Sequence, residues 1–282
     1  MKFKVSAELG YQAKSEGTII LNIHALNTDR QKVLEETFTI TPQQNSKELN
    51  TVTTDNRFIR IDIKEPGDYI VNYQALVNNY FEVHNYKEYT DTSMSDLDPS
   101  VLTYLNPSRY CQSDKLYRLA ENEFGSLANN YNKVVAVTKW IHNHVEYLSG
   151  SSTSETSAYD TVAQQAGVCR DFAHLGIALC RALTIPARYF TGYSHMLIPQ
   201  DFHACFEAYI GGKWLLFDAT RLSPLNGFVK IATGRDAADA SIASMFGDVA
   251  NTSIKVDSQI AEGTDFKPVY HYPSIYDGVT YL

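Results

Sequence analysis

The first 81 residues alternate apolar and polar side chains with a period of two, and turn-forming residues separate the apolar runs. This alternation, together with many β-branched and aromatic residues, is typical of β-strands that bury one face. The predicted strands cover residues 2–7, 17–26, 33–40, 58–64 and 68–77, and a polar turn covers residues 41–46. Because no helical pattern interrupts these strands, the pattern predicts an N-terminal antiparallel β-sandwich.

The character of the chain changes after residue 81. Residues 82–100 are polar, with a composition typical of a linker. The length of 282 residues also favours two domains of ordinary size. We therefore predict a boundary near residue 95, with the β-sandwich domain over residues 1–95 and a second domain over residues 96–282.

Helical and strand patterns alternate in the second part of the chain. The predicted helices cover residues 115–124, 130–145 and 169–183, and the predicted strands cover residues 188–193, 204–210 and 214–218. Gly211-Gly212 joins the last two strands as a tight hairpin. A Ser/Thr-rich stretch at residues 149–157 is a predicted loop that borders a site. The whole pattern predicts the α+β class.

The composition is that of a globular protein, with 44% hydrophobic, 12% aromatic and 20% charged residues. The formal charge is −8, so nucleic acid and anionic membrane surfaces are not expected partners. No apolar run approaches the roughly 18 residues that span a bilayer, and the first residues lack the apolar core of a secretory signal. The sequence therefore predicts a cytoplasmic protein.

The chain has four cysteines, Cys111, Cys169, Cys180 and Cys205. They form no CxxC pair and no cluster, and no phosphate-binding loop or calcium motif is present, so we expect no metal, disulfide or cofactor. Cys169 stands where a helix is predicted to begin, and free backbone N–H groups and the helix dipole stabilise a thiolate there. It is a candidate nucleophile, with a buried, inert thiol as the alternative. Cys180, on the apolar body of the same helix, fits the inert role.

The hairpin places a histidine and an aspartate side by side. A two-residue loop pairs Cys205 with Asp218 when residues are counted outwards from the turn, and His203 lies two residues before Cys205. His203 and Asp218 are then diagonal neighbours on one face of the sheet. Such a pair can act as a base and its orienting carboxylate, although many His-Asp pairs are only structural. With Cys169 at a helix start upstream, the chain order Cys, His, Asp favours a thiol nucleophile, a general base and an orienting carboxylate.

Five segments of the second domain match a known pattern. They are YLNPSRYCQSD at 104–114, GVCRDFAHL at 167–175, LCRALTIPARY at 179–189, HACFEAY at 203–209 and WLLFDAT at 214–220. In this order they resemble the transglutaminase-like superfamily of cysteine hydrolases, in its bacterial branch with an N-terminal β-sandwich. The resemblance implies a papain-like or transglutaminase-like core, in which a helix with the cysteine packs on an antiparallel sheet with the histidine and aspartate. It also implies that Cys169 is the nucleophile, His203 the base and Asp218 the orienting acid.

The resemblance implies an enzyme that acts on a peptide, a protein or another amide through a thioester, a cysteine protease or amidase. Protein cross-linking by acyl transfer is one alternative, and a binding or scaffold module with an idle triad is another. Arg170 and Cys205 stand where relatives of the family carry Trp, so we expect a wetter site that favours hydrolysis. The backbone N–H of Cys169 is the predicted oxyanion donor. Tyr147 is expected to be a packing aromatic, with a contribution to the oxyanion site as the alternative. His174 is expected either to line the site or to lie on an exposed helix face.

Overall fold

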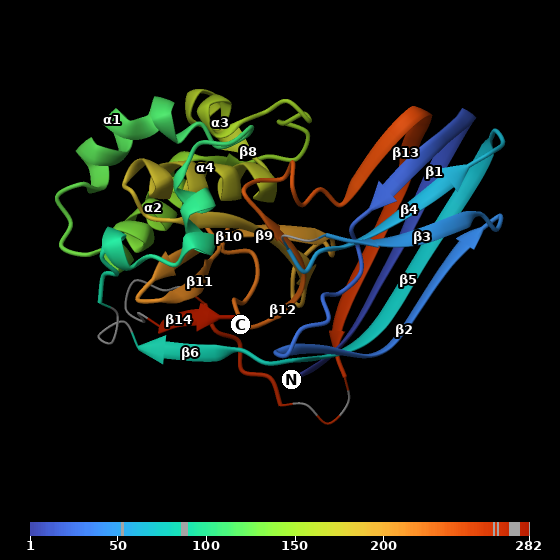
Figure 1. Cartoon of the computed structure of the whole chain (residues 1–282), viewed down its shortest axis with the longest axis horizontal. Helices are drawn as coiled ribbons and strands as arrows, with labels where there is room; N and C mark the ends of the chain where they lie inside the picture. Colours follow the sequence, from blue (N-terminus) through green and yellow to red (C-terminus); the bar gives the residue numbers. More distant parts are fainter. Residues whose placement is uncertain (52–53, 86–89, 262, 264, 271–276, 282) are drawn as a thin grey trace.

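The computed structural model describes residues 1–51, 54–85, 90–261, 263, 265–270 and 277–281. A curled antiparallel sheet forms one end of the molecule (Figure 1). A second antiparallel sheet, with a group of helices packed on it, forms the other end. This arrangement agrees with the α+β class expected from the sequence.

The first sheet is built on β1 (Lys2–Leu21), which has strand neighbours along both edges. Its order is β2-β5-β1-β4-β3. β5 and β4 pair one after the other with one edge of β1, and β13 pairs with the opposite edge. The bounds are β2 (Gln31–Thr41), β3 (Asn45–Asn50), β4 (Arg57–Ile63), β5 (Gly67–Asn79) and β13 (Ala243–Ile260). Alternate residues of β1 are buried, beginning with Phe3 and Val5, as the period of two predicts.

Four strands depart from the sequence prediction. The two predicted strands at 2–7 and 17–26 lie on one long strand, β1, which ends at Leu21, before the predicted end, and whose register shifts between Ala13 and Gly17. β3 occupies residues that were partly assigned to a turn. Part of the predicted linker is β6 (Glu82–Asn85), a strand of the second sheet, while residues 86–89 of that linker lie outside the described residues. β13 comes from the region assigned to the second domain, yet it completes the first sheet.

The second sheet has the order β12-β9-β10-β11-β14-β6. The bounds are β9 (Ala187–Ser194), β10 (Phe202–Ile210), β11 (Lys213–Phe217), β12 (Phe228–Gly234) and β14 (Asp277–Thr280). The predicted hairpin register is confirmed, because Ile210 pairs with Lys213 and Phe206 with Phe217. Gly211 and Gly212 both have positive φ, 59° and 77°, which a tight hairpin of this kind requires.

The helices lie together on the second sheet (Figure 1). They are α1 (Ser113–Phe124), α2 (Asn130–His144), α3 (Ala158–Gln164) and α4 (Cys169–Ala182), preceded by the 3₁₀ turns η2 (Met94–Asp96) and η3 (Pro99–Leu105). From Asp171 onwards every residue of α4 is buried. A Cβ on Gly176 would meet the ring of Phe206 at 2.4 Å, so this glycine lets α4 approach β10 closely. No helix among the described residues is long and apolar enough to cross a membrane.

Candidate active site

Cys169 is the first residue of α4, as the sequence predicts, and it is partly exposed. Two contacts fix this helix start. The side chain of Asp171, in the first turn of the helix, accepts a hydrogen bond from the backbone N–H of Val168 at 2.9 Å. The short strand β7 (Glu146–Tyr147) also pairs with β8 (Ala166–Gly167), immediately before the helix. The thiol is therefore placed by a rigid helix terminus.

His203 and Asp218 meet as the hairpin register predicts. Nε2 of His203 lies 3.0 Å from Oδ2 of Asp218, and both side chains are buried. The other carboxylate oxygen of Asp218 accepts hydrogen bonds from the backbone N–H of Thr220 at 2.9 Å and from its hydroxyl at 2.7 Å. The His203 ring stacks on Phe228, with centroids 5.7 Å apart. The imidazole orientation is thus fixed by a carboxylate on one edge and an aromatic ring on one face.

The second ring nitrogen of His203, Nδ1, is buried and has no hydrogen-bond partner of ordinary geometry. Burial disfavours the charged imidazole, but the charge and hydrogen bond of Asp218, with contributions from Cys205 and Cys169, raise the pKa of His203 well above its usual value. Burial opposes the charge of Asp218 too, and His203 and Thr220 nevertheless lower the pKa of that carboxyl. The pair therefore favours an imidazolium beside a carboxylate, which is the form that His203 takes once Nδ1 has received the proton of Cys169.

The other three thiols are buried. Burial raises the pKa of Cys111 and Cys180, and burial together with the charge of Asp218 raises the pKa of Cys205 to about 12. Cys205 packs with Phe190 and Phe228 in an apolar cluster and is 1% exposed, so it does not line an open part of the site. The expectation of a wetter site therefore depends on Arg170 alone.

One group of residues with metal-binding side chains lies close together in the described part of the chain. Single ligand atoms of His203, Cys205 and Asp218 lie within 4.8 Å of one another. His203 and Asp218 already satisfy each other through their hydrogen bond, and the Cys205 thiol stays protonated at neutral pH because its pKa is raised. The trio is therefore a His-Asp pair beside a neutral thiol rather than a set of free metal ligands.

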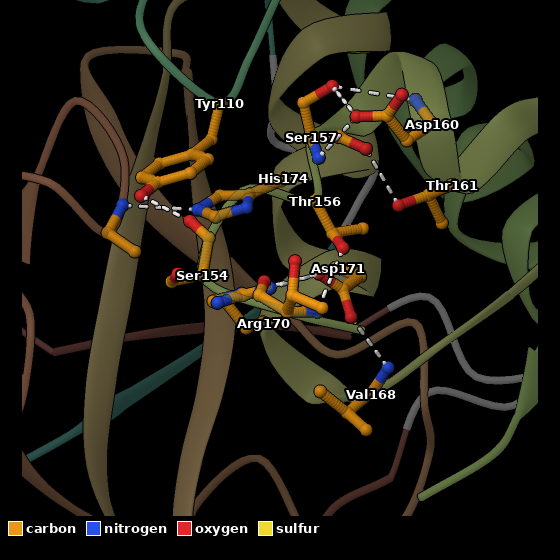
Figure 2. Close-up of polar contacts among 12 residues, drawn as sticks. Tyr110, Ser154, Thr156, Ser157, Asp160, Thr161, Val168, Arg170, Asp171 and His174 are labelled. Atoms are coloured by element: carbon orange, nitrogen blue, oxygen red, sulfur yellow. Dashed lines mark hydrogen bonds and ion pairs between the residues drawn. The ribbon is translucent and has the colours of Figure 1, made fainter. Parts of the chain in front are cut away.

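Arg170, next to the thiol, connects α4 to the Ser/Thr-rich loop (Figure 2). Its guanidinium pairs with Asp171 at 3.0 Å and donates to the backbone oxygen of Thr153. It also lies 5.9 Å from the ring centroid of Tyr110. That ring stacks on His174 with centroids 5.0 Å apart and an interplanar angle of 6°. His174 is fully buried and accepts from the backbone N–H of Ala237, so it does not lie on an exposed face.

Tyr147, expected from the sequence to be a packing aromatic or a contributor to the site, lies beside the start of the candidate nucleophile's helix. It pairs with Gly167, two residues before Cys169, and its ring packs on Phe172 with centroids 5.8 Å apart. Burial and the charge of Cys169 raise the pKa of Tyr147 to about 12, although the Cys169 backbone N–H near the hydroxyl acts in the opposite direction. The hydroxyl is therefore protonated at neutral pH, and it lies at the N–H group predicted to stabilise an oxyanion.

Two family models match the chain. The model of the bacterial transglutaminase N-terminal domain matches residues 1–100, and that of the transglutaminase-like superfamily matches residues 118–219. The second match includes Cys169, His203 and Asp218. These matches agree with the resemblance that the sequence motifs indicate.

A crystal structure of a Cytophaga hutchinsonii protein, described as a candidate cysteine protease, is 51% identical in sequence. It superposes with a TM-score of 0.97, over all of this chain and 98% of that one. Uncharacterized proteins of Mycobacterium leprae and Mycobacterium tuberculosis H37Rv are each 30% identical, over 116 and 114 residues. Those alignments cover 38% and 35% of this chain, and 42% and 36% of the two mycobacterial proteins.

Proposed function

We infer from the geometry of this site that the chain, which belongs to the transglutaminase-like superfamily, is a cysteine hydrolase that cleaves amide bonds in peptides or proteins. The observation behind the proposal is the buried hydrogen bond between Nε2 of His203 and Asp218. It leaves Nδ1 of the imidazole able to accept a proton from the thiol at the start of α4. Cys169 is the proposed nucleophile, His203 the base and Asp218 the group that fixes the imidazole tautomer.

The proposed reaction has two steps. The Cys169 thiol gives its proton to His203 Nδ1, and the sulfur attacks the carbonyl carbon of the substrate amide. The backbone N–H of Cys169 stabilises the oxyanion, the C–N bond breaks, and the leaving amine takes the proton back from the imidazole. Water then attacks the thioester, with His203 as the base, and the acid product and the free thiol are released. Asp218 stabilises the imidazolium that forms in both steps.

Hydrolysis is proposed over transfer to an amine because of the group that flanks the thiol. A transferase excludes water from its acyl-enzyme, usually with large aromatic side chains beside the nucleophile. Here the flanking side chain is the Arg170 guanidinium, which is fixed by Asp171 and Thr153. A charged group at this position excludes water less well than an aromatic side chain, so water should reach the thioester.

The decisive experiment offers water and an amine together. The enzyme is incubated with a mixture of glutamine-containing peptides and a labelled primary amine at millimolar concentration, and peptide cleavage, ammonia and bound label are all measured. We expect cleavage or deamidation with little incorporated label. Stoichiometric incorporation of amine would instead identify a cross-linking enzyme, and no turnover of any peptide would favour an idle triad.

The nucleophile is tested separately with a limiting amount of iodoacetamide at pH 6 to 7 and mass spectrometry of the four cysteines. We expect Cys169 to be alkylated first, because the other three thiols are buried and their pKa values are raised. Cys169→Ala should abolish turnover, whereas the matched variant Cys180→Ala, in the same helix, should keep it. Faster alkylation of Cys111 or Cys205 would refute the assignment.

A further inference from the structure

A cavity of about 270 Å³ lies between the two parts of the molecule, away from Cys169. On one side it is lined by residues at the end of the first sheet, among them Gln31, which begins β2, and Asn79, which ends β5. On the other side it is lined by residues of the second sheet, among them Arg188, Trp214 and Lys230. The two sides are joined by hydrogen bonds: Gln31 donates to the backbone oxygen of Lys230 at 2.8 Å and accepts from its N–H at 2.7 Å.

Two cations on the wall of this cavity share one buried carboxylate. Glu207 is fully buried in β10 and accepts from Nε of Arg188 with one oxygen and from Nζ of Lys230 with the other, at 3.3 Å. Asp55, an exposed residue, is the one acidic side chain that lines the cavity in the described part of the chain. Burial lowers the pKa of Lys230 to about 8 despite the nearby Glu207, so its positive charge is incompletely compensated.

Arg188 presents a free binding edge to the cavity. Glu207 takes only Nε, and no described residue accepts a hydrogen bond from the two terminal nitrogens of the guanidinium. The Cζ atom of the guanidinium lies over the Trp214 ring, 4.2 Å from the ring centroid, and this contact helps to hold the group in place. Two parallel N–H donors on a fixed guanidinium match the two oxygens of a carboxylate.

Asn79 adds a hydrogen-bond acceptor to the cavity. Its side-chain nitrogen donates to the backbone oxygen of Phe228, but its side-chain oxygen is buried and has no hydrogen-bond partner in the described structure. Asn79 is 1% exposed, and a buried acceptor without a donor costs free energy unless another group satisfies it. A ligand N–H or O–H in the cavity would supply that donor.

We propose that this cavity is a binding site for a small organic carboxylate, held by the terminal nitrogens of Arg188 and by Lys230. The nonpolar part of the ligand packs on Trp214 and Tyr281, which line the cavity, and a donor group of the ligand reaches Asn79. The cavity volume limits the ligand to roughly the size of an amino acid or a dicarboxylate. Because residues of both sheets line it, an occupied cavity holds the first sheet against the second.

The test measures binding by calorimetry and by thermal shift on the full chain with the Cys169→Ala substitution, so that catalysis does not enter the result. Succinate, benzoate and glutamate are compared with inorganic phosphate and chloride at equal ionic strength. We expect at least one carboxylate to bind with a one-to-one stoichiometry. If phosphate binds equally well, or no carboxylate binds, the carboxylate site is refuted.

Two substitutions locate the site. Arg188→Lys keeps the ion pair with Glu207 but removes the two-pronged donor edge, and it should weaken carboxylate binding at least tenfold while the chain stays folded. Arg235→Lys, at an exposed arginine that pairs with Asp239, is the matched control and should leave the affinity unchanged. The proposal would be overturned if both substitutions weakened carboxylate binding equally, or if neither substitution weakened it.

Discussion

The imidazole of His203 and the carboxylate of Asp218 depend on each other for their charges. Both are buried, and burial alone would neutralise each of them. Their mutual contact reverses that tendency, since it raises the pKa of His203 and lowers the pKa of Asp218. Removal of either partner therefore leaves the other group buried without a counter-charge, so that group becomes neutral or destabilises the fold.

This dependence fixes the pH range in which the pair stabilises the fold. The folded-state pKa of His203 is raised, so its contribution is complete below the unfolded value of about 6.5 and is lost as the pH rises through the folded value. The folded-state pKa of Asp218 is lowered, so its contribution is complete above about pH 3.9 and is lost as the pH falls through the folded value.

We therefore expect Asp218→Asn to cost the most free energy of unfolding between about pH 4 and 6.5, with a smaller loss outside that range. Urea denaturation of both proteins from pH 3 to 9 measures this difference. Asp248→Asn, at an exposed aspartate of β13, is the control and should show no such maximum. A difference that grows steadily above pH 8 would contradict the assignment of charges to the pair.

Tyr147 is the second residue whose chemistry can be tested. Its neutral hydroxyl lies at the Cys169 N–H, so it can donate a second hydrogen bond to an oxyanion formed there. Tyr147→Phe should lower kcat on the order of a hundredfold while KM and the alkylation rate of Cys169 change little. Tyr159→Phe, at another exposed tyrosine, is the control. An unchanged or higher kcat would show that the hydroxyl only occupies the place of the substrate oxygen.

At the scale of the elements, the relation between α4 and β10 decides whether the thiol and the imidazole meet. Cys169 begins the helix and His203 lies near the start of the strand, and the two elements touch where Gly176 faces Phe206. An added methyl group at Gly176 would press on the ring and push the helix away from the sheet. A small shift at this point would be transmitted to the thiol because the helix is rigid.

Gly176→Ala should therefore lower stability by about 1–3 kcal/mol, the usual cost of overpacking, and should lower kcat as well. The double variant Gly176→Ala with Phe206→Leu offers a smaller partner to the new methyl group. We expect it to lose less stability than the two single variants added together. Strict additivity in a double-mutant cycle would show that the two residues do not press on each other.

The elements themselves were largely predictable where the pattern is local. The periods of helix and strand gave α1, α2 and α4, and the Gly211-Gly212 turn alone set the register that brings His203 to Asp218. Pairing between distant segments was not predictable, because β13 and β6 pair with strands far along the chain. Most residues of β13 and half of those of β6 are exposed, so their apolar pattern is weak. The burial of His174 was ambiguous for a similar reason, since its partners, Tyr110 and Ala237, come from other elements.

For the whole molecule, the first sheet is a product of both ends of the chain. β13 pairs with β1 from Phe3 to Leu21, while β5 and β4 share the opposite edge of β1. The boundary near residue 95 stays a prediction, and a piece cut there would lack the strand that covers one edge of β1. An uncovered edge of this length is a site for pairing with other chains.

We therefore expect a fragment of residues 1–95 to be aggregated or unfolded when it is expressed alone. A second fragment, in which residues 243–260 follow residues 1–95 through a flexible linker, should be monomeric and fold cooperatively. Circular dichroism and size-exclusion chromatography distinguish the two. If the shorter fragment is a stable monomer, β13 is dispensable for the first sheet.

The place of β13 in the chain also sets a schedule for synthesis. During translation β1 to β5 are made first, and the second-sheet strands β6 and β9 to β12 follow. Only then is β13 made, the strand that covers the remaining edge of β1, and β14 comes last. The nascent protein thus spends much of its translation with one edge of β1 unprotected, even though its N-terminal segment has long been available to fold. Codon choices that slow the ribosome shortly before residue 243 should lengthen that exposure and lower the yield of native protein, although they change no amino acid.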